Sequence, residues 1–137
     1  MIVLDTDTLT LLMKGHARIA NRMEQAEEVA ITIVTRIEVL QGRFASILKA
    51  ADGAELWQAQ QRLDETERYI HVVPIIPFDT AAVAAFEKLL VNKKLKKIGR
   101  ADLLISSITL ANRATLVTRN LQHFGQVPGL HLENWAD

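Results

Sequence analysis

The chain has 137 residues and 49% of them are hydrophobic, which suits a single globular domain that covers residues 1–137 and buries a core. The 16 basic and 16 acidic residues cancel, which excludes the strongly basic charge of a general nucleic-acid binder, so affinity for a polyanion must come from a local patch. The lack of cysteine excludes disulfides, thiolate metal sites and cysteine nucleophiles.

The amino terminus is predicted to form a short buried strand followed by helices. Residues 1–4 are apolar, and the polar cluster that begins at Asp5 carries the chain into helical periodicity that is interrupted at Gly15. No basic region precedes Asp5, and no later apolar run approaches the length of a membrane span. We therefore expect a cytoplasmic protein without a membrane segment.

The middle of the chain is predicted to alternate between strands and helices. A second strand covers residues 29–34, and Thr35 opens a helix that runs to about Leu48. Another helix begins near Asp52 and is amphipathic over residues 55–69.

A third apolar run, residues 72–76, contains Pro74 and precedes Pro77, so we expect an edge strand or a strand end. Asp79 is predicted to cap the next helix. The remaining predicted elements are a helix over 80–91, a basic segment over 92–98, a helix over 99–112, a strand over 115–118, a loop or single turn over 120–124 and a strand over 130–133.

Strands separated by helix-length segments predict a three-layer α/β/α domain with a mainly parallel central sheet. Such sheets bind ligands at the carboxyl ends of their strands, where the strand order reverses. Asp5 follows the first predicted strand and Glu38 begins the helix after the second, so both are expected near that edge.

Three acids, Asp5, Glu38 and Asp102, lie where the chain leaves an apolar strand or enters a helix. Carboxylates gathered in one place repel one another and lose solvation, so a fold that gathers them normally needs a divalent cation. Gly42 and Ser106 lie one turn after two of these acids and are predicted to leave an open polar notch. The pattern therefore favours a metal-dependent enzyme.

Each acid alone also fits a helix start without chemistry. Thr35 and Glu38 have the spacing of a capping box, Asp102 fits a first helical turn, and Asp5 or Thr6 fits a helix cap. Asp7 is expected to point elsewhere or to bind local amides. No histidine shows metal-ligand spacing, and Trp57 and Trp135 are predicted to be packing residues.

The sequence resembles the PIN domain family, and within it the VapC-type toxins of bacterial toxin–antitoxin pairs. The resemblance spans nearly the whole chain and lies in residues 3–6, 35–42, 98–107, 116–120 with 123–124, and 128–130 with 134–135. It implies a small α/β/α domain with endoribonuclease activity and an acidic pocket for Mg²⁺ or Mn²⁺. Asp5, Glu38 and Asp102 match the family's three main acids.

We expect Asp5 and Asp102 to hold the cation, directly or through water, while Glu38 completes the acidic ring or orients the attacking water as general base. Thr6 lies in the first motif, and Thr118 matches a polar residue at the end of the fourth strand. Many members have a further aspartate where this chain has Asn120 or His123, so a second metal site is in doubt. Asn120 retains the ability to hold a metal-bound water.

Arg36, Arg43 and Arg100 are predicted to contact flanking phosphates of an RNA substrate. The resemblance implies a cognate antitoxin as partner and a homodimer. Apolar residues near Leu12 or Leu56 would serve as a binding surface, although they fit the core equally well.

Three other functions remain open from the residues. A haloacid-dehalogenase-like phosphatase shares an apolar strand followed by Asp5-Thr6-Asp7 but needs a late acidic motif that this chain lacks. A receiver-like domain would need its acceptor aspartate at the end of the third strand, where Pro77 and Phe78 precede Asp79. A non-catalytic Mg²⁺-binding α/β module is the third alternative.

Overall fold

The computed structural model describes all residues 1–137 as five strands, seven α-helices and one short 3₁₀ helix. The strands are β1 (Ile2–Leu4), β2 (Val29–Thr32), β3 (Ile75–Ile76), β4 (Thr115–Val117) and β5 (His131–Glu133). The helices are α1 (Thr6–Met13), α2 (Ala17–Gln25), α3 (Ile33–Lys49), α4 (Gly53–Val72), α5 (Thr80–Leu90), α6 (Arg100–Ala111) and α7 (Leu121–Phe124), with the 3₁₀ helix at Lys93–Leu95.

All five strands are parallel and form one sheet in the order β3-β2-β1-β4-β5. The chain builds outward from β1 to β3, and then returns to place β4 on the other side of β1. The order therefore reverses between β1 and β4, and the carboxyl ends of these two strands flank the reversal. The two-residue strand β3 lies at an edge, as Pro74 and Pro77 predicted, because proline cannot donate to a central ladder.

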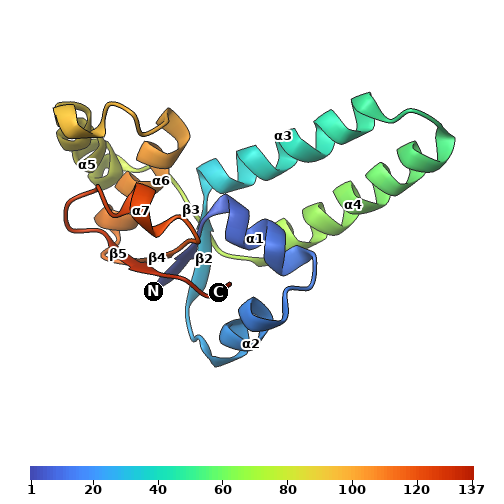
Figure 1. Cartoon of the computed structure of the whole chain (residues 1–137), viewed down its shortest axis with the longest axis horizontal. Coiled ribbons are helices and arrows are strands. Elements are labelled where there is room, and N and C mark those ends of the chain that lie inside the picture. Colours follow the sequence, from blue (N-terminus) through green and yellow to red (C-terminus); the bar gives the residue numbers. More distant parts are fainter.

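Successive strand residues face opposite sides of the sheet, so the alternation of the β-strand produces two cores. Val3 and Leu116 pack with α5, α6 and α7 through a cluster that includes Ile105. Leu4 and Val117 pack on the other face with α1, α2 and α3. The sheet is thus covered by α1 to α4 on one side and by α5 to α7 on the other, which confirms the three-layer architecture (Figure 1).

Helices α3 and α4 form a long hairpin that extends away from the sheet (Figure 1). Far from the sheet there is little to bury, and Phe44, Leu48, Leu56 and Trp57 are exposed on this hairpin. The prediction that Trp57 is a packing residue is therefore wrong, whereas Trp135 is buried in the second core as predicted.

Aspartate side chains begin three of the helices. Asp5, Asp52 and Asp79 each accept a hydrogen bond from the amide of the residue three positions later, at 2.8 to 3.0 Å. Gly15 has φ +88°, a conformation that favours glycine, and it separates α1 from α2 at the predicted interruption.

The capping box predicted at Thr35 and Glu38 is wrong. Helix α3 begins two residues earlier, because Thr32 at the end of β2 accepts the amide of Thr35 at 3.1 Å and takes the capping position. Glu38 therefore lies inside the helix, where no backbone amide needs it. No helix of this protein combines the length and the apolar composition that crossing a membrane requires.

Candidate active site at the carboxyl edge of the sheet

A cavity of about 640 Å³ lies at the carboxyl edge of the sheet, beside the point where the strand order reverses. It is lined by Asp5, Thr6, Asp7, Thr10, Glu38, Asp102, Arg119, Asn120, Phe124 and Asp137. The three acids predicted from the sequence thus meet in one cavity, although they come from the end of β1, from α3 and from the start of α6.

Asp5 is the most buried of the three acids, with 6% of its surface exposed. Its amide donates to the carbonyl of Val117 at 3.0 Å, and the hydroxyl of Thr8 donates to the same carbonyl at 3.1 Å, so the start of α1 is fixed to the end of β4. Burial raises the pKa of the Asp5 carboxyl above its usual 3.8, although hydrogen bonds with Thr118 and Thr8 lower it in part. No cationic nitrogen lies within 4.0 Å of this carboxylate.

Glu38 is held by a chain of hydroxyl groups. The hydroxyl of Thr6 donates to its Oε1 at 2.6 Å, and the hydroxyl of the buried Thr35 lies 3.1 Å from that of Thr6. Oε2 of Glu38 has no hydrogen-bond partner in the protein. One oxygen of this carboxylate is therefore fixed, and the other is free to bind a ligand in the cavity.

Asp102 occupies the third helical position of α6, after the cap at Gly99, which confirms its place in a first turn. Nε2 of His123 lies 2.9 Å from its Oδ2. Because an ionised carboxylate can only accept, a hydrogen bond to ionised Asp102 requires the His123 tautomer that carries its proton on Nε2. The imidazole also contacts the ring of Phe124 edge-on, with centroids 5.3 Å apart. One oxygen of Asp102 is therefore oriented by His123, from the short helix α7.

The loop after β4 supplies the polar residues that the sequence predicted in supporting roles. The buried hydroxyl of Thr118 accepts the amide of Asn120 at 3.0 Å, and the side chain of Asn120 caps α7 by accepting the amide of His123 at 3.4 Å. This local chain positions His123 against Asp102, so the fixed backbone at the end of β4 orients an acid of α6.

Several sequence-predicted residues do not line this cavity. Arg36 borders a separate hollow between α3, α4 and β3, Arg43 borders a third cavity, and the guanidinium of Arg100 lies over the ring of Phe86. The predicted notch is also wrong in its details. Gly42 is exposed on α3, Ser106 is fully buried with an unpartnered hydroxyl, and neither lines the cavity.

Five lining residues were not identified as site residues from the sequence: Asp7, Thr10, Arg119, Phe124 and Asp137. Asp7 is exposed and lines the cavity, so the expectation that it points elsewhere is wrong. Arg119 follows Thr118 at a strand end, a position that could have been found from the sequence. Its Nε lies 3.4 Å from Oδ2 of Asp137, which no local pattern predicts.

The lining carries five carboxylates and one guanidinium, so the cavity is strongly negative. The atoms that these acids offer as metal ligands are all oxygen, which suits a hard divalent cation. The buried carboxylate of Asp5 has no cationic side chain as a partner. No three acidic, histidine or cysteine side chains lie close enough together to hold one ion directly. Glu38 and Asp102 are instead directed toward Thr6 and His123. The donor chemistry fits a cation that is bound by two carboxylates and completed by water.

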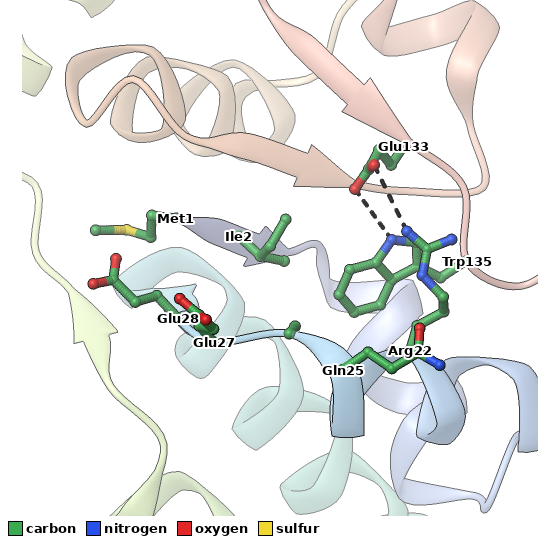
Figure 2. A pocket seen from close by; sticks show the side chains of 9 residues that line it. Met1, Ile2, Arg22, Gln25, Glu27, Glu28, Glu133 and Trp135 are labelled. Atoms are coloured by element: carbon green, nitrogen blue, oxygen red, sulfur yellow. Dashed lines mark hydrogen bonds and ion pairs between the residues drawn. The ribbon is translucent and has the colours of Figure 1, made fainter.

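A different hollow of about 440 Å³ lies at the amino end of β1 and is lined by Met1, Ile2 and residues of α2 and β5 (Figure 2). In it the indole of Trp135 donates to Glu133 at 3.2 Å, and Arg22 lies 5.0 Å over the indole ring and 3.7 Å from Glu133. These contacts fix α2 to the carboxyl-terminal segment. The arrangement is structural, since the guanidinium of Arg22 pairs with Glu133 and covers the ring of Trp135.

The fold agrees with comparisons to known proteins. The family model of the PIN domain matches residues 2–130. Ribonuclease VapC2 of Rickettsia felis is 35% identical over 78 residues, a match that spans 56% of this chain and 58% of that relative's length.

Solved structures match over almost the full length. VapBC2 of Rickettsia felis bound to a DNA fragment from its promoter gives a TM-score of 0.80 at 30% identity, covering 98% of this chain and 99% of that one. VapBC-1 of nontypeable Haemophilus influenzae gives a TM-score of 0.79 at 24% identity over the whole of both chains and shows the same fold. The chain therefore belongs to the PIN domain family, and within that family it resembles the VapC-type proteins.

Proposed function

We propose that this chain is a metal-dependent endoribonuclease, formed by one domain over residues 1–137, that hydrolyses phosphodiester bonds in RNA as the toxin of a toxin–antitoxin pair. One observation carries the proposal: Asp5, Glu38 and Asp102, which are far apart in the sequence, line one cavity at the switch point of a parallel sheet. The relative named a ribonuclease adds support, since its match includes more than half of this chain.

Asp5 and Asp102 would hold the cation, directly or through water, and the oxygen-only donor set favours Mg²⁺ or Mn²⁺. When bound, the cation would supply Lewis-acid stabilisation of the negative charge that builds on the phosphate. Glu38 acts as general base: Thr6 fixes its Oε1, and Oε2 is left to accept a proton from the attacking water. His123 keeps Asp102 oriented through the 2.9 Å contact, and Thr118 and Asn120 support that loop.

A partner is proposed from the relatives alone. The solved structures at 30% and 24% identity are VapBC assemblies. We propose that this chain likewise pairs with an antitoxin and forms a homodimer. Size-exclusion chromatography with light scattering, with and without a co-expressed upstream open reading frame, tests both statements.

The nuclease proposal is tested with Glu38→Gln and Asp102→Asn, which keep the shape of each side chain and remove its charge. Cleavage of tRNA and ribosomal RNA in Mg²⁺ or Mn²⁺ should fall on the order of 100-fold in each variant, because a general base or a metal ligand is lost. A chelator should abolish cleavage by the parent chain.

Asp79→Asn is the matched control, because Asp79 caps α5 as Asp5 caps α1 but does not line the cavity. It should cut RNA at the parent rate. Cleavage by folded Glu38→Gln and Asp102→Asn at the parent rate would contradict the proposal. Trapping of an aspartyl-phosphate with a small phosphate ester would favour the phosphatase alternative instead.

A further inference from the structure

A second, basic cavity lies beside the acidic one and has no role in the proposed chemistry. Its volume is about 770 Å³, and it is lined by Met13, Lys14, Arg43, Arg62, Glu65, Thr66 and Tyr69. Three cations face one acid in this lining. We propose that this basic cavity binds a backbone phosphate of the RNA substrate one or two nucleotides from the cut bond, which rests on the nuclease function proposed above.

Arg43 is the best-fixed cation of the cavity. Its Nε donates to the hydroxyl of Thr66 at 2.9 Å, and Thr66 is fully buried between α3 and α4. The other N–H groups of this guanidinium have no protein partner. An arginine that is held by one nitrogen and free at the others presents a preformed fork, which suits a phosphate.

The charges of this cavity are not neutralised within the chain. None of the nitrogens of Lys14, Arg43 and Arg62 lies within 4.0 Å of a carboxylate, since the ion pairs of the molecule are those of Arg22, Arg119 and His123. Arg119, in contrast, is held by Asp137. Unpaired cations around a cavity leave a positive potential that attracts a polyanion.

Helices α1 and α3 each contribute residues to both the acidic and the basic cavity. Thr10 of α1 lines the acidic cavity and Lys14, at the end of that helix, lines the basic one. On α3, Glu38 lines the acidic cavity and Arg43 lines the basic one, but Arg43 comes five residues later and so projects about 140° around the helix from Glu38. At 1.5 Å rise per residue the offset from Thr10 to Lys14 along α1 is about 6 Å.

This offset along the helix axis matches the spacing of phosphates in a nucleic-acid strand. A strand advances about 3.4 Å per phosphate in a duplex and further when extended, so the offset along α1 corresponds to one or two nucleotides. The acidic cavity repels the backbone of its own substrate, and a basic cavity one step along the strand offsets that repulsion. Arg43 is therefore the one of the three predicted arginines whose surroundings fit a phosphate contact.

The main test is the double variant Lys14→Gln and Arg62→Gln, since both side chains are exposed and neither has a partner whose loss would disturb folding. Arg43→Lys is the second variant, which keeps the charge and removes the fork. Arg68→Gln is the control, because Arg68 is exposed on the same helix α4 but lines neither cavity.

RNA affinity is measured by fluorescence anisotropy of a labelled single-stranded oligonucleotide, with Asp102→Asn added to every chain to prevent cleavage. We expect the double variant to weaken binding about tenfold and the control to leave it unchanged. The slope of log affinity against log salt should decrease by about 0.7 for each phosphate that the variant no longer binds. In the cleavage-competent chain, KM should rise by the same factor while kcat changes little.

The outcomes separate this inference from the proposed function. If Asp102→Asn fails to stop cleavage, the nuclease assignment fails, whatever the basic cavity does. If cleavage depends on Asp102 but the double variant keeps the parent affinity and salt slope, the basic cavity does not bind substrate. Loss of binding to an acidic peptide such as polyglutamate, with RNA affinity unchanged, would assign the cavity to a protein partner and overturn the inference.

Discussion

The substitution Asp5→Asn separates the two roles of the most buried acid. The side-chain oxygen that accepts the amide of Thr8 at 2.8 Å is present in both aspartate and asparagine, so the cap of α1 is retained. Only the negative charge is lost. Asp5→Ala removes both the cap and the charge, and the difference between the two variants isolates the cap.

The pH dependence of the stability difference follows from the direction of the pKa change. Burial raises the pKa of folded Asp5 above its unfolded value of 3.8, so the folded chain binds this proton more tightly. Stability from the protonated carboxyl is fully present below pH 3.8 and is lost as pH rises through the raised pKa. Asp5→Asn lacks this loss, so without metal its stability relative to the parent should increase across that range.

The expected sizes can be compared in melting temperature. Each tenfold change in proton affinity on folding corresponds to about 1.4 kcal/mol, and a chain of this size shifts by about 4 °C per kcal/mol. Asp5→Ala should lie below Asp5→Asn by about 1 kcal/mol, the typical worth of an N-cap. Addition of Mn²⁺ at about 100 times its dissociation constant should stabilise the parent by about 2.7 kcal/mol, and neither variant by a comparable amount.

The assay is thermal unfolding followed by circular dichroism at pH values from 4 to 8, in chelator and in Mn²⁺. A melting temperature of Asp5→Asn that does not rise relative to the parent between pH 4 and 8 without metal would refute the reasoning, because the folded chain would then not bind the Asp5 proton more tightly than the unfolded chain. Equal stabilisation of parent and Asp5→Asn by Mn²⁺ would remove Asp5 from the metal site.

Three further predictions concern the neighbours of the acids and the core. His123→Asp should strengthen Mn²⁺ binding severalfold in a titration followed by electron paramagnetic resonance, because it adds a carboxylate beside Asp102; weaker binding would contradict this. Thr6→Val should lower kcat about tenfold with little change in KM, since Glu38 loses its 2.6 Å donor, and an unchanged kcat would remove this orienting role. Leu116→Ala, fully buried on central strand β4, should cost about 3 kcal/mol by urea denaturation, and a cost below 1 kcal/mol would show that the core collapses around the gap.

Much of the fold was predictable because strands and helices here obey local rules. The apolar runs before Asp5 and after Ala114 became the central strands β1 and β4, and Pro74 marked the edge. The start of α3 was not predicted, because Ile33 and Val34 continue the β-branched run of the strand before them. The hydroxyl of Thr32 caps α3 and so marks the point where the strand ends. β-Propensity alone does not predict such a helix cap.

The gathering of the three acids could be expected from the sequence, but their immediate partners could not. Pairing of β1 with β4 brings residues more than 100 positions apart into contact, and an element order of this kind is implied by the alternation of strands and helices. The contact between His123 and Asp102, and that between Arg119 and Asp137, depends on side-chain rotamers across loops. No sequence periodicity predicts such contacts. From the sequence, His123 was therefore noted only as the replacement of an expected aspartate, and Arg119 was given no role.

Helix capping and chemistry are compatible in Asp5, because a carboxylate has two oxygens and the cap of α1 uses one of them. In Glu38 one oxygen is bound by Thr6, in Asp102 one is bound by His123, and each retains a second oxygen without a protein partner. Asp79 accepts a helix amide as Asp5 does, yet it lies outside the acidic cavity. A helix-start position therefore does not argue against chemistry. What distinguishes the acids of the site is that the end of β1, the first turn of α6 and the interior of α3 bring them to one negative edge of the sheet, and Asp5→Asn tests that charge while it leaves the cap of α1 in place.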